Sequence, residues 1–197
     1  MKVVKVICAL LICGFVSVSH AAVIFITEKD TNGNVTSLLG ADNVQVNGLF
    51  YNVRFQDGSC IALFNGCDDP EDFLFGSNAD ALAASNSLLS QVFIRGTSFD
   101  IFPQLTNGCG LLILCEVLTP FGLSSTDRVS IWSAVNSGGA SGDYVQFSEE
   151  FPRAASTNSR YTYADWSKHV EASAPGTAMV LLMGIAGLIV SQRRKQA

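Results

Sequence analysis

The stretch that most constrains this chain lies near its C-terminal end, at residues 173–195. The segment from Thr177 to Val190 is apolar and carries no charge. Counted from Ala174 to Val190 it has 17 residues, or about 25 Å of helix, against a hydrocarbon core of roughly 30 Å. Cations after a last apolar segment hold that end in the cytoplasm. We therefore predict a transmembrane helix at 177–190, rather than a core helix that is apolar on every side, and a basic tail formed by Arg193, Arg194 and Lys195.

The residues around this helix resemble a known processing signal. Pro175, Gly176 and Thr177, the glycine-containing apolar helix and the basic tail are similar to the PEP-CTERM sorting signal of Gram-negative bacteria. Ser173 and Ala174 stand where that signal has its Pro and Glu. The resemblance implies that an exosortase, a membrane transpeptidase-like enzyme, processes the chain here. An ordinary single-pass anchor is the competing interpretation.

The first 21 residues have the layout of a secretory signal peptide. Lys2 and Lys5 precede an apolar run at 6–18, and the small residues Ser19 and Ala21 form a cleavage pattern. We predict cleavage after Ala21 rather than retention as an N-terminal anchor. The two ends together predict export across the inner membrane and anchoring by the C-terminal helix, followed by transfer to the cell surface or matrix. The chain then divides into a signal peptide at 1–21, an ectodomain at 22–166, a tether at 167–174 and a sorting signal at 175–197.

Export also determines the expected state of the cysteines. Four remain after the signal peptide is removed, and in an oxidising compartment they would form two disulfides in one of three connectivities. We favour Cys60 with Cys67 and Cys109 with Cys115, because each pair closes a short loop that contains a glycine. A zinc site is disfavoured, since the spacings are not those of its usual close pairs and no histidine lies nearby.

The charge of the exported part is strongly one-sided. Residues 22–172 carry 17 Asp and Glu against 7 Lys and Arg, a net charge of −10, whereas the whole chain has −5. An anionic domain repels phosphate backbones, so nucleic acid is excluded as a partner. Four acids gather in the loop 65–72, which could bind Ca²⁺ or form a solvated turn; we favour the turn because the spacing is not that of an EF-hand. These acids are Asp68, Asp69, Glu71 and Asp72.

The clearest fold signal in the ectodomain is Asn47-Gly48. This pair between two alternating runs selects a type I′ turn and predicts a hairpin that pairs Val46 with Leu49 and Val44 with Tyr51. In that register the apolar side chains share one face, so the hairpin covers a core on one side only. The predicted apolar face consists of Val44, Val46, Leu49, Tyr51, Val53 and Phe55, and the polar face of Gln45, Asn52 and Arg54.

One helix is predicted at 78–93. Its capping-box-like start at Ser77 and the helical spacing of Leu82, Leu89 and Phe93 indicate a helix that packs these three side chains on a sheet.

The remaining elements are expected to be short strands. Segment 99–105, interrupted by Pro103, is expected to be an edge strand or a loop. The apolar insert 110–114 is expected to be core rather than an exposed patch for a partner. The predicted fold class is α+β, mainly antiparallel with one packed helix, and the alternative is a β-sandwich with an inserted helix. The expected strands lie at 60–64, 73–75, 128–135, 144–147 and 161–166.

Residues suited to catalysis are scarce. Once the signal peptide is removed, the one histidine is His169, in the tether. The sequence has no nucleophile elbow, phosphate-binding glycine loop or metal-ligating histidine set, and no pair of acids is singled out by its spacing. We predict neither enzymatic activity nor a cofactor.

Two functions of different class remain. The first is a structural or adhesive envelope protein that an exosortase-like enzyme transfers from the bacterial membrane into exopolysaccharide or biofilm matrix. The second is a glycan-binding module on an ordinary anchor, in which exposed aromatic side chains stack on sugar rings. The aromatic candidates are Tyr51, Tyr144, Tyr161, Tyr163, Trp132 and Trp166.

Overall fold

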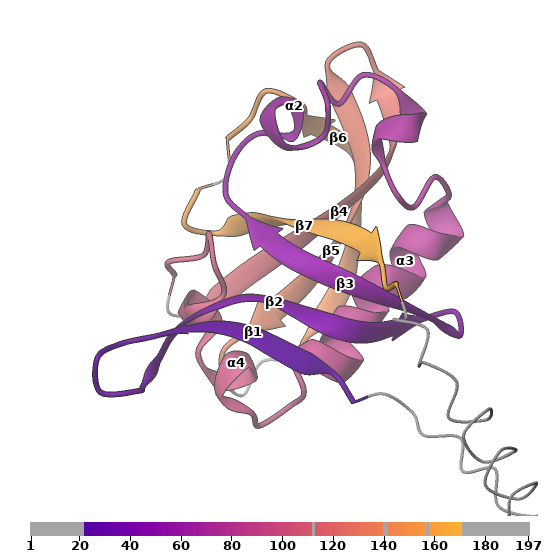
Figure 1. Ribbon diagram of the computed structural model, residues 1–197. Coiled ribbons are helices and arrows are strands. Elements are labelled where there is room, and N and C mark those ends of the chain that lie inside the picture. The colour runs from indigo at the N-terminus through magenta and orange to yellow at the C-terminus, as the bar shows by residue number, and fades with distance from the viewer. Residues whose placement is uncertain (1–21, 112, 140–141, 157, 171–197) are drawn as a thin grey trace, which may run out of the picture.

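A computed structural model describes residues 22–111, 113–139, 142–156 and 158–170. Its main feature is a seven-stranded mixed sheet with the strand order β1-β2-β3-β7-β4-β5-β6 (Figure 1). The strands are β1 (Ile24–Lys29), β2 (Val35–Val46), β3 (Leu49–Gln56), β4 (Leu114–Ser125), β5 (Arg128–Ser137), β6 (Tyr144–Pro152) and β7 (Tyr161–Lys168). The helical elements are α2 (Cys60–Leu63), η1 (Pro70–Asp72), α3 (Asn78–Ser87), η2 (Leu88–Val92), α4 (Ser98–Ile101) and η3 (Pro103–Leu105).

The last strand of the domain occupies the centre of the sheet. β7 is antiparallel to β3 and parallel to β4, whereas every other neighbouring pair is antiparallel. β7 thus joins an N-terminal group of strands, β1 to β3, to the meander of β4 to β6. The predicted α+β class is confirmed at this level.

The β2–β3 hairpin forms as predicted. Asn47 and Gly48 have φ values of 49° and 83°, as a type I′ turn requires, and Val46 pairs with Leu49 and Val44 with Tyr51. Leu49 was wrongly expected to be buried: its exposed fraction is 62%. It directly follows the turn, as the first residue of β3.

The helix α3 and its continuation η2 cover one face of the sheet. Ser77 caps the helix by accepting a hydrogen bond from the Asp80 N–H, as expected. Leu82 and Leu89, which were predicted to pack on the sheet, are only half-buried. Most of the side chains that α3 turns toward the sheet are small, alanine or serine. Small residues allow the helix to approach the strands closely. The buried residues are Ala81, Ala84, Ser85, Ser87, Leu88, Val92 and Phe93.

A second core lies on the opposite face of the sheet. Along β7, Ala164 belongs to the cluster under α3 and Tyr163 to this second cluster, as the alternation of a strand requires. The segment 59–75 covers this second core and then continues toward α3. The second cluster comprises Cys60, Phe64, Cys67, Phe73, Leu118, Val129, Ile131 and Tyr163.

Two strands predicted in that segment are wrong. Residues 60–63 form one helical turn, because the Ser59 side chain caps the Ala62 N–H and a disulfide closes the loop behind it. Residues 73–75 form no strand: Phe73 enters the second cluster and Phe75 the first. The rings of Phe73 and Phe75 hold residues 73–75 against the two cores, although the backbone of these residues is not part of the sheet.

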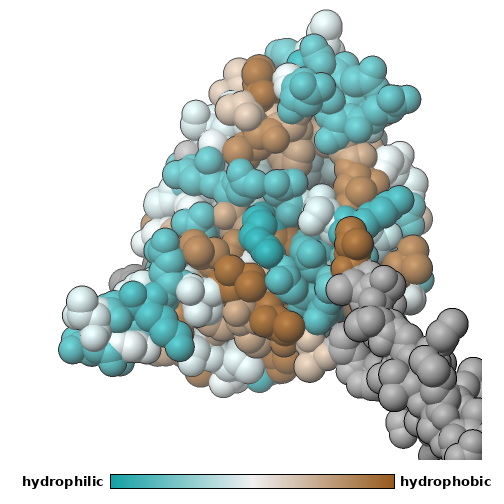
Figure 2. Space-filling view, in the orientation of Figure 1, coloured by the Kyte–Doolittle hydropathy of each residue, from teal (hydrophilic) through white to brown (hydrophobic). Residues whose placement is uncertain are grey.

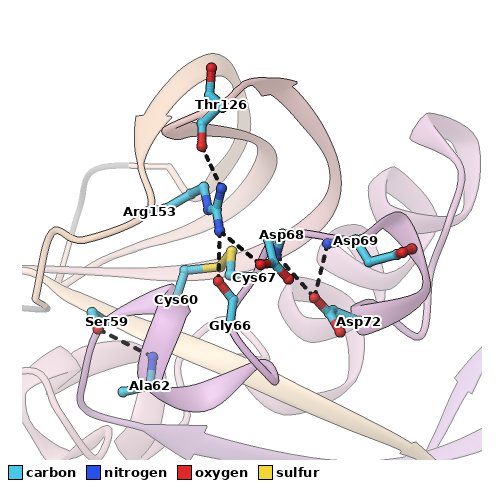
Figure 3. The surroundings of a disulfide bond; sticks show 10 residues. All are labelled: Ser59, Cys60, Ala62, Gly66, Cys67, Asp68, Asp69, Asp72, Thr126 and Arg153. Atoms are coloured by element: carbon cyan, nitrogen blue, oxygen red, sulfur yellow. Dashed lines mark hydrogen bonds and ion pairs between the residues drawn. A yellow bond between two sulfur atoms is a disulfide. The ribbon is translucent and has the colours of Figure 1, made fainter.

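Both favoured disulfides are present, Cys60–Cys67 and Cys109–Cys115, with Cα atoms 5.6 and 5.7 Å apart. Around the first, Arg153 donates to the carbonyl oxygens of Gly66 and Thr126 and so ties the disulfide loop to the β4–β5 turn (Figure 3). Disulfides of this kind form in oxidising, extracytoplasmic compartments.

Three further expectations need correction. Residues 99–105 contain α4 and η3 rather than a strand. The insert 110–114 is not core: Leu111 and Ile113 are 38% and 74% exposed, because the loop lies outside the sheet before β4 begins. Strand β7 extends to Lys168, two residues beyond the predicted end of the domain.

The predicted signal peptide at 1–21 and the sorting signal at 175–197 lie outside the described residues, as do residues 171–174 of the tether. Among the described residues, no helix is both long and apolar enough to cross a bilayer.

Replacing Gly40 tests the close approach of β2 and β3. A Cβ atom at this position would collide with the Val53 carbonyl oxygen. We expect Gly40→Ala to lower the free energy of unfolding by about 2–3 kcal/mol, at the upper end of the range for overpacking. Urea denaturation followed by circular dichroism measures this loss. Gly122→Ala is the control, because its Cβ would meet no atom within 4 Å. Equal stability of the two variants would contradict the packing described here.

Candidate binding surface

A row of side chains crosses four strands on the face opposite α3, at the border of the second core, against which Tyr161 packs. Backbone register places Tyr161 beside Glu116, Glu116 beside Val135, and Val135 beside Tyr144. These positions lie on β7, β4, β5 and β6 in turn, so the two tyrosines are three strand spacings apart, roughly 14 Å. Tyr144 is 49% exposed and Tyr161 is half-buried.

Arg160 supplies the charge of this row. Its guanidinium donates to Glu116 Oε1 from Nε at 2.7 Å and lies 2.5 Å from it through Nη2. The hydrogen bond to Glu116 raises the pKa of Arg160, and the carbon at the centre of the guanidinium lies 5.5 Å from the Tyr161 ring centroid. The Glu116 side chain is 7% exposed and that of Arg160 is 46% exposed, so the carboxylate is buried beneath a guanidinium that still faces solvent.

Backbone hydrogen bonds and a disulfide fix the chain around Glu116 and Arg160. Glu116 N–H donates to the Arg160 carbonyl oxygen at 2.8 Å, and Gly110 N–H donates to the Ser159 carbonyl oxygen at 2.7 Å. The Cys109–Cys115 disulfide fixes the loop directly before Glu116. The row of Tyr144, Glu116, Arg160 and Tyr161 therefore forms a pre-organised surface, which we call the tyrosine–arginine row.

Such a row can make two kinds of contact. Tyrosine rings offer apolar faces with a hydroxyl at one end, and an arginine offers several N–H donors in one plane. A polyhydroxylated ligand has both apolar C–H faces and acceptor oxygens, so it matches this combination. Sequence reasoning identified the two tyrosines but missed Arg160 and Glu116, because strand pairing alone brings them together.

The other predicted aromatic candidates do not share this surface. Tyr51, Tyr163 and Trp166 are buried in the two cores, and burial raises the pKa of the Tyr163 phenol. Trp132 is only partly buried, on the α3 face, where its Nε1 donates to Asn78 Oδ1 at 2.8 Å.

Trp132 belongs to a second aromatic group that the sequence did not reveal. Its ring centroid lies 5.1 Å from that of Phe147, which in turn lies 6.2 Å from that of Phe121. The three rings come from β5, β6 and β4. Phe147 is 38% exposed, whereas Phe121 and Trp132 pack against the core under α3. This group mainly completes the core at the start of the helix.

The fold also brings two carboxyl groups together, those of Asp100 and Asp143. Asp100 Oδ2 accepts a hydrogen bond from the Gly96 N–H at 2.6 Å, and Asp143 Oδ1 accepts one from the Ser137 N–H at 2.8 Å. Burial raises the pKa of Asp143, and the charge and hydrogen bond of Asp100 raise it further. Each carboxylate thus caps a loop, and the pair borders a hollow of about 260 Å³ beside Phe93 and Arg95.

In the acidic loop at 65–72, carboxylates accept hydrogen bonds from backbone N–H groups of the same loop. Asp72 Oδ2 accepts the N–H groups of Asp68 and Asp69, each at 3.0 Å, and the Asp69 bond is the main reason that the pKa of Asp72 is lowered (Figure 3). Asp69 in turn accepts the Glu71 N–H. Arg153 lies 3.9 Å from Asp68. In the described part of the chain, no three potential metal ligands come together.

The last candidate residues lie at the C-terminal exit. His169 Nδ1 is 3.2 Å from Asn52 Oδ1, at the end of β7 and away from the paired acids. The predicted processing residues, from Ser173 to Thr177 and from Arg193 to Lys195, fall outside the described residues. Comparisons with protein-family models, characterised proteins and solved structures find no match to this chain.

Asp143→Asn should stabilise the domain at neutral pH. The folded domain retains the proton of Asp143 to a higher pH than the unfolded chain does, so the contribution of Asp143 to stability is greatest below its ordinary pKa of 3.8 and falls as pH rises through the raised folded pKa. Asparagine keeps the acceptor for Ser137 without the charge. We expect a gain of about 0.5–1 kcal/mol at pH 7, as for other surface-charge improvements.

Urea denaturation at pH 4 and pH 7 measures this effect. Asp127→Asn is the control, because that side chain is 81% exposed. The gain from Asp143→Asn should be larger at pH 7 than at pH 4. A gain that is the same at both pH values would show that the charge of Asp143 does not matter.

Proposed function

We propose that this chain is an exported structural or adhesive protein of the cell envelope, anchored by residues 177–190 and then processed by an exosortase-like enzyme. In this proposal the domain enters the exopolysaccharide or biofilm matrix after release. The proposal rests on the sequence of the two chain ends, together with the character of the domain between them.

The observation that carries the proposal is the pair of disulfides. Cys60–Cys67 and Cys109–Cys115 close loops of the kind that stabilise exported domains, typically by about 2–4 kcal/mol each. Export is what the sequence of residues 1–21 predicts independently. A stable, acidic domain that carries no catalytic constellation among its described residues suits a role in structure or attachment.

The arrangement of polar groups supports a non-catalytic role. The acidic loop caps its own turn, and Asp100 and Asp143 each accept a backbone N–H. The four cysteines among the described residues form two disulfides. These groups therefore have structural partners already.

Intact mass spectrometry of the protein recovered from cells tests the proposal. We expect a chain that begins at Ala22 and ends between Ser173 and Thr177, in a soluble or matrix-bound fraction. Replacing Pro175, Gly176 and Thr177 together by alanine should abolish processing and leave the chain in the membrane fraction. A wild-type mass that still includes Arg193 to Ala197, found only in membranes, would favour an ordinary anchor.

A glycan-binding module is the second candidate, and the tyrosine–arginine row favours it. Tyr144→Ala should weaken binding to an oligosaccharide by about 1 kcal/mol, or roughly fivefold in Kd, because one stacking surface is lost. Isothermal titration calorimetry against a panel of neutral and acidic oligosaccharides measures this change. Phe102→Ala is the matched control, because Phe102 is exposed to a similar extent, 48%, on another surface. If no oligosaccharide binds the wild-type protein, or if both variants bind equally well, this role is excluded.

A further inference from the structure

We propose that the domain rests on the lipid headgroups of its own bilayer, through an exit face formed by Leu49, Lys168, His169 and Val170. The proposal rests on the proposed anchoring by residues 177–190 and adds an orientation to it. The occupant of this face is a phospholipid surface, recognised by apolar side chains beside the ammonium group of Lys168.

The two chain ends leave the domain close together and are held in place. Asn43 Nδ2 donates to the Ala22 carbonyl oxygen at 3.2 Å, and His169 N–H donates to the Phe50 carbonyl oxygen at 3.0 Å. Asn52 Oδ1 connects the two, since it accepts the Asn43 N–H at 3.4 Å and lies 3.2 Å from His169 Nδ1. The start of β1 and the end of β7 accordingly lie at the same end of the molecule (Figure 1). A membrane segment attached at the C-terminal end therefore determines which face of the domain turns toward the bilayer.

The chain between the domain and the membrane is short. Residues 171–176 separate Val170 from the predicted span at 177–190. Six extended residues reach at most about 22 Å. With the apolar stretch counted from Ala174, its 17 residues come closer to a hydrocarbon core of roughly 30 Å, and the three remaining linker residues reach at most about 11 Å. The exit face is thus kept beside the lipid surface.

The chemistry of the exit face fits headgroups. Leu49 is 62% exposed and Val170 is 83% exposed, and residues 48–51 line a hollow of about 420 Å³ together with Lys168 and His169. Lys168 forms no ion pair with another described residue. A lysine between apolar side chains can bury its methylene stem and extend its ammonium to a phosphate.

Charge elsewhere on the domain sets the orientation. Four of the seven cations at 22–172 are already paired with acids, and the net charge of −10 drives most of the surface away from an anionic bilayer. Lys168, which is not in an ion pair with any described residue, lies at the place that the tether would bring to the lipid. The four paired cations are Arg54, Arg128, Arg153 and Arg160.

A second copy of the chain is the weaker occupant. A stable protein interface buries about 800 Å² on each partner, whereas the exit face has only two large exposed apolar side chains. Contact with the bilayer needs little affinity of its own, because a short tether gives an effective concentration in the millimolar range.

Site-directed fluorescence tests this orientation. The chain from Ala22 to Ala197 carrying Leu49→Cys, which keeps the predicted anchor, is labelled with an environment-sensitive dye and reconstituted in vesicles of phosphatidylethanolamine, phosphatidylglycerol and a lipid with a spin-labelled headgroup. We expect the dye to be quenched several-fold more strongly than at Ile61→Cys. Ile61 is a matched control, because it is 44% exposed on α2, far from the exit face in Figure 1. Lys168→Glu in the Leu49→Cys chain should reduce the quenching.

Resistance to alkaline carbonate extraction separates the orientation from the anchor. Equal quenching at positions 49 and 61 in a chain that resists extraction would refute the orientation and leave the anchor standing. A chain that is extracted, with neither dye quenched, would refute both. Quenching at position 49 that rises with the ratio of protein to lipid and persists with Lys168→Glu would indicate pairing of two copies and overturn the lipid contact.

Discussion

The whole sheet depends on the insertion of β7 between β3 and β4. With β3 it forms six residue pairs, but its parallel ladder with β4 has only three, from Glu116 to Leu118. Side chains reinforce both junctions: Trp166 Nε1 donates to Thr119 Oγ1 on β4 at 3.3 Å, and Thr162 Oγ1 donates to the Gln56 carbonyl oxygen on β3 at 3.1 Å. The two halves of the sheet become one structure only when the last strand of the domain is in place.

This central position of β7 accounts for both surfaces discussed above. The residue before β7 is Arg160, which pairs with Glu116 on the parallel neighbour β4, and the residue after it is His169, which pairs with Phe50 near the start of β3. One end of β7 therefore carries the tyrosine–arginine row and the other end carries the exit face. A ligand on the row would lie at the far end of a strand whose other end carries the proposed exit face.

The outer strands of the sheet are unsuited to pairing with another chain. β1 is interrupted by register shifts after Ile26 and after Glu28, and it ends at Lys29. β6, the other outer strand, carries Glu149, Glu150 and Pro152. Bulges, charges and proline are the usual means by which proteins prevent edge-to-edge association. Attachment to a matrix would then use the faces and the chain ends of the domain rather than the edges of the sheet. On the face seen in Figure 2, apolar residues, in brown, lie over β1 and β2.

Local signals in the sequence determined those parts of the fold that need only neighbours along the chain: the Asn47-Gly48 hairpin, the helix capped at Ser77, and the two disulfides across short loops. Tertiary structure decided the rest. Phe73 and Phe75 look like a strand, yet they serve two different cores, and the apolar insert that includes Ile113 lies outside the sheet. Arg160 and Glu116, like Asp100 and Asp143, are 44 and 43 positions apart and meet only through strand pairing and loop packing. Periodicity reports which side chains share a face of one element, but it carries no information on which elements become neighbours.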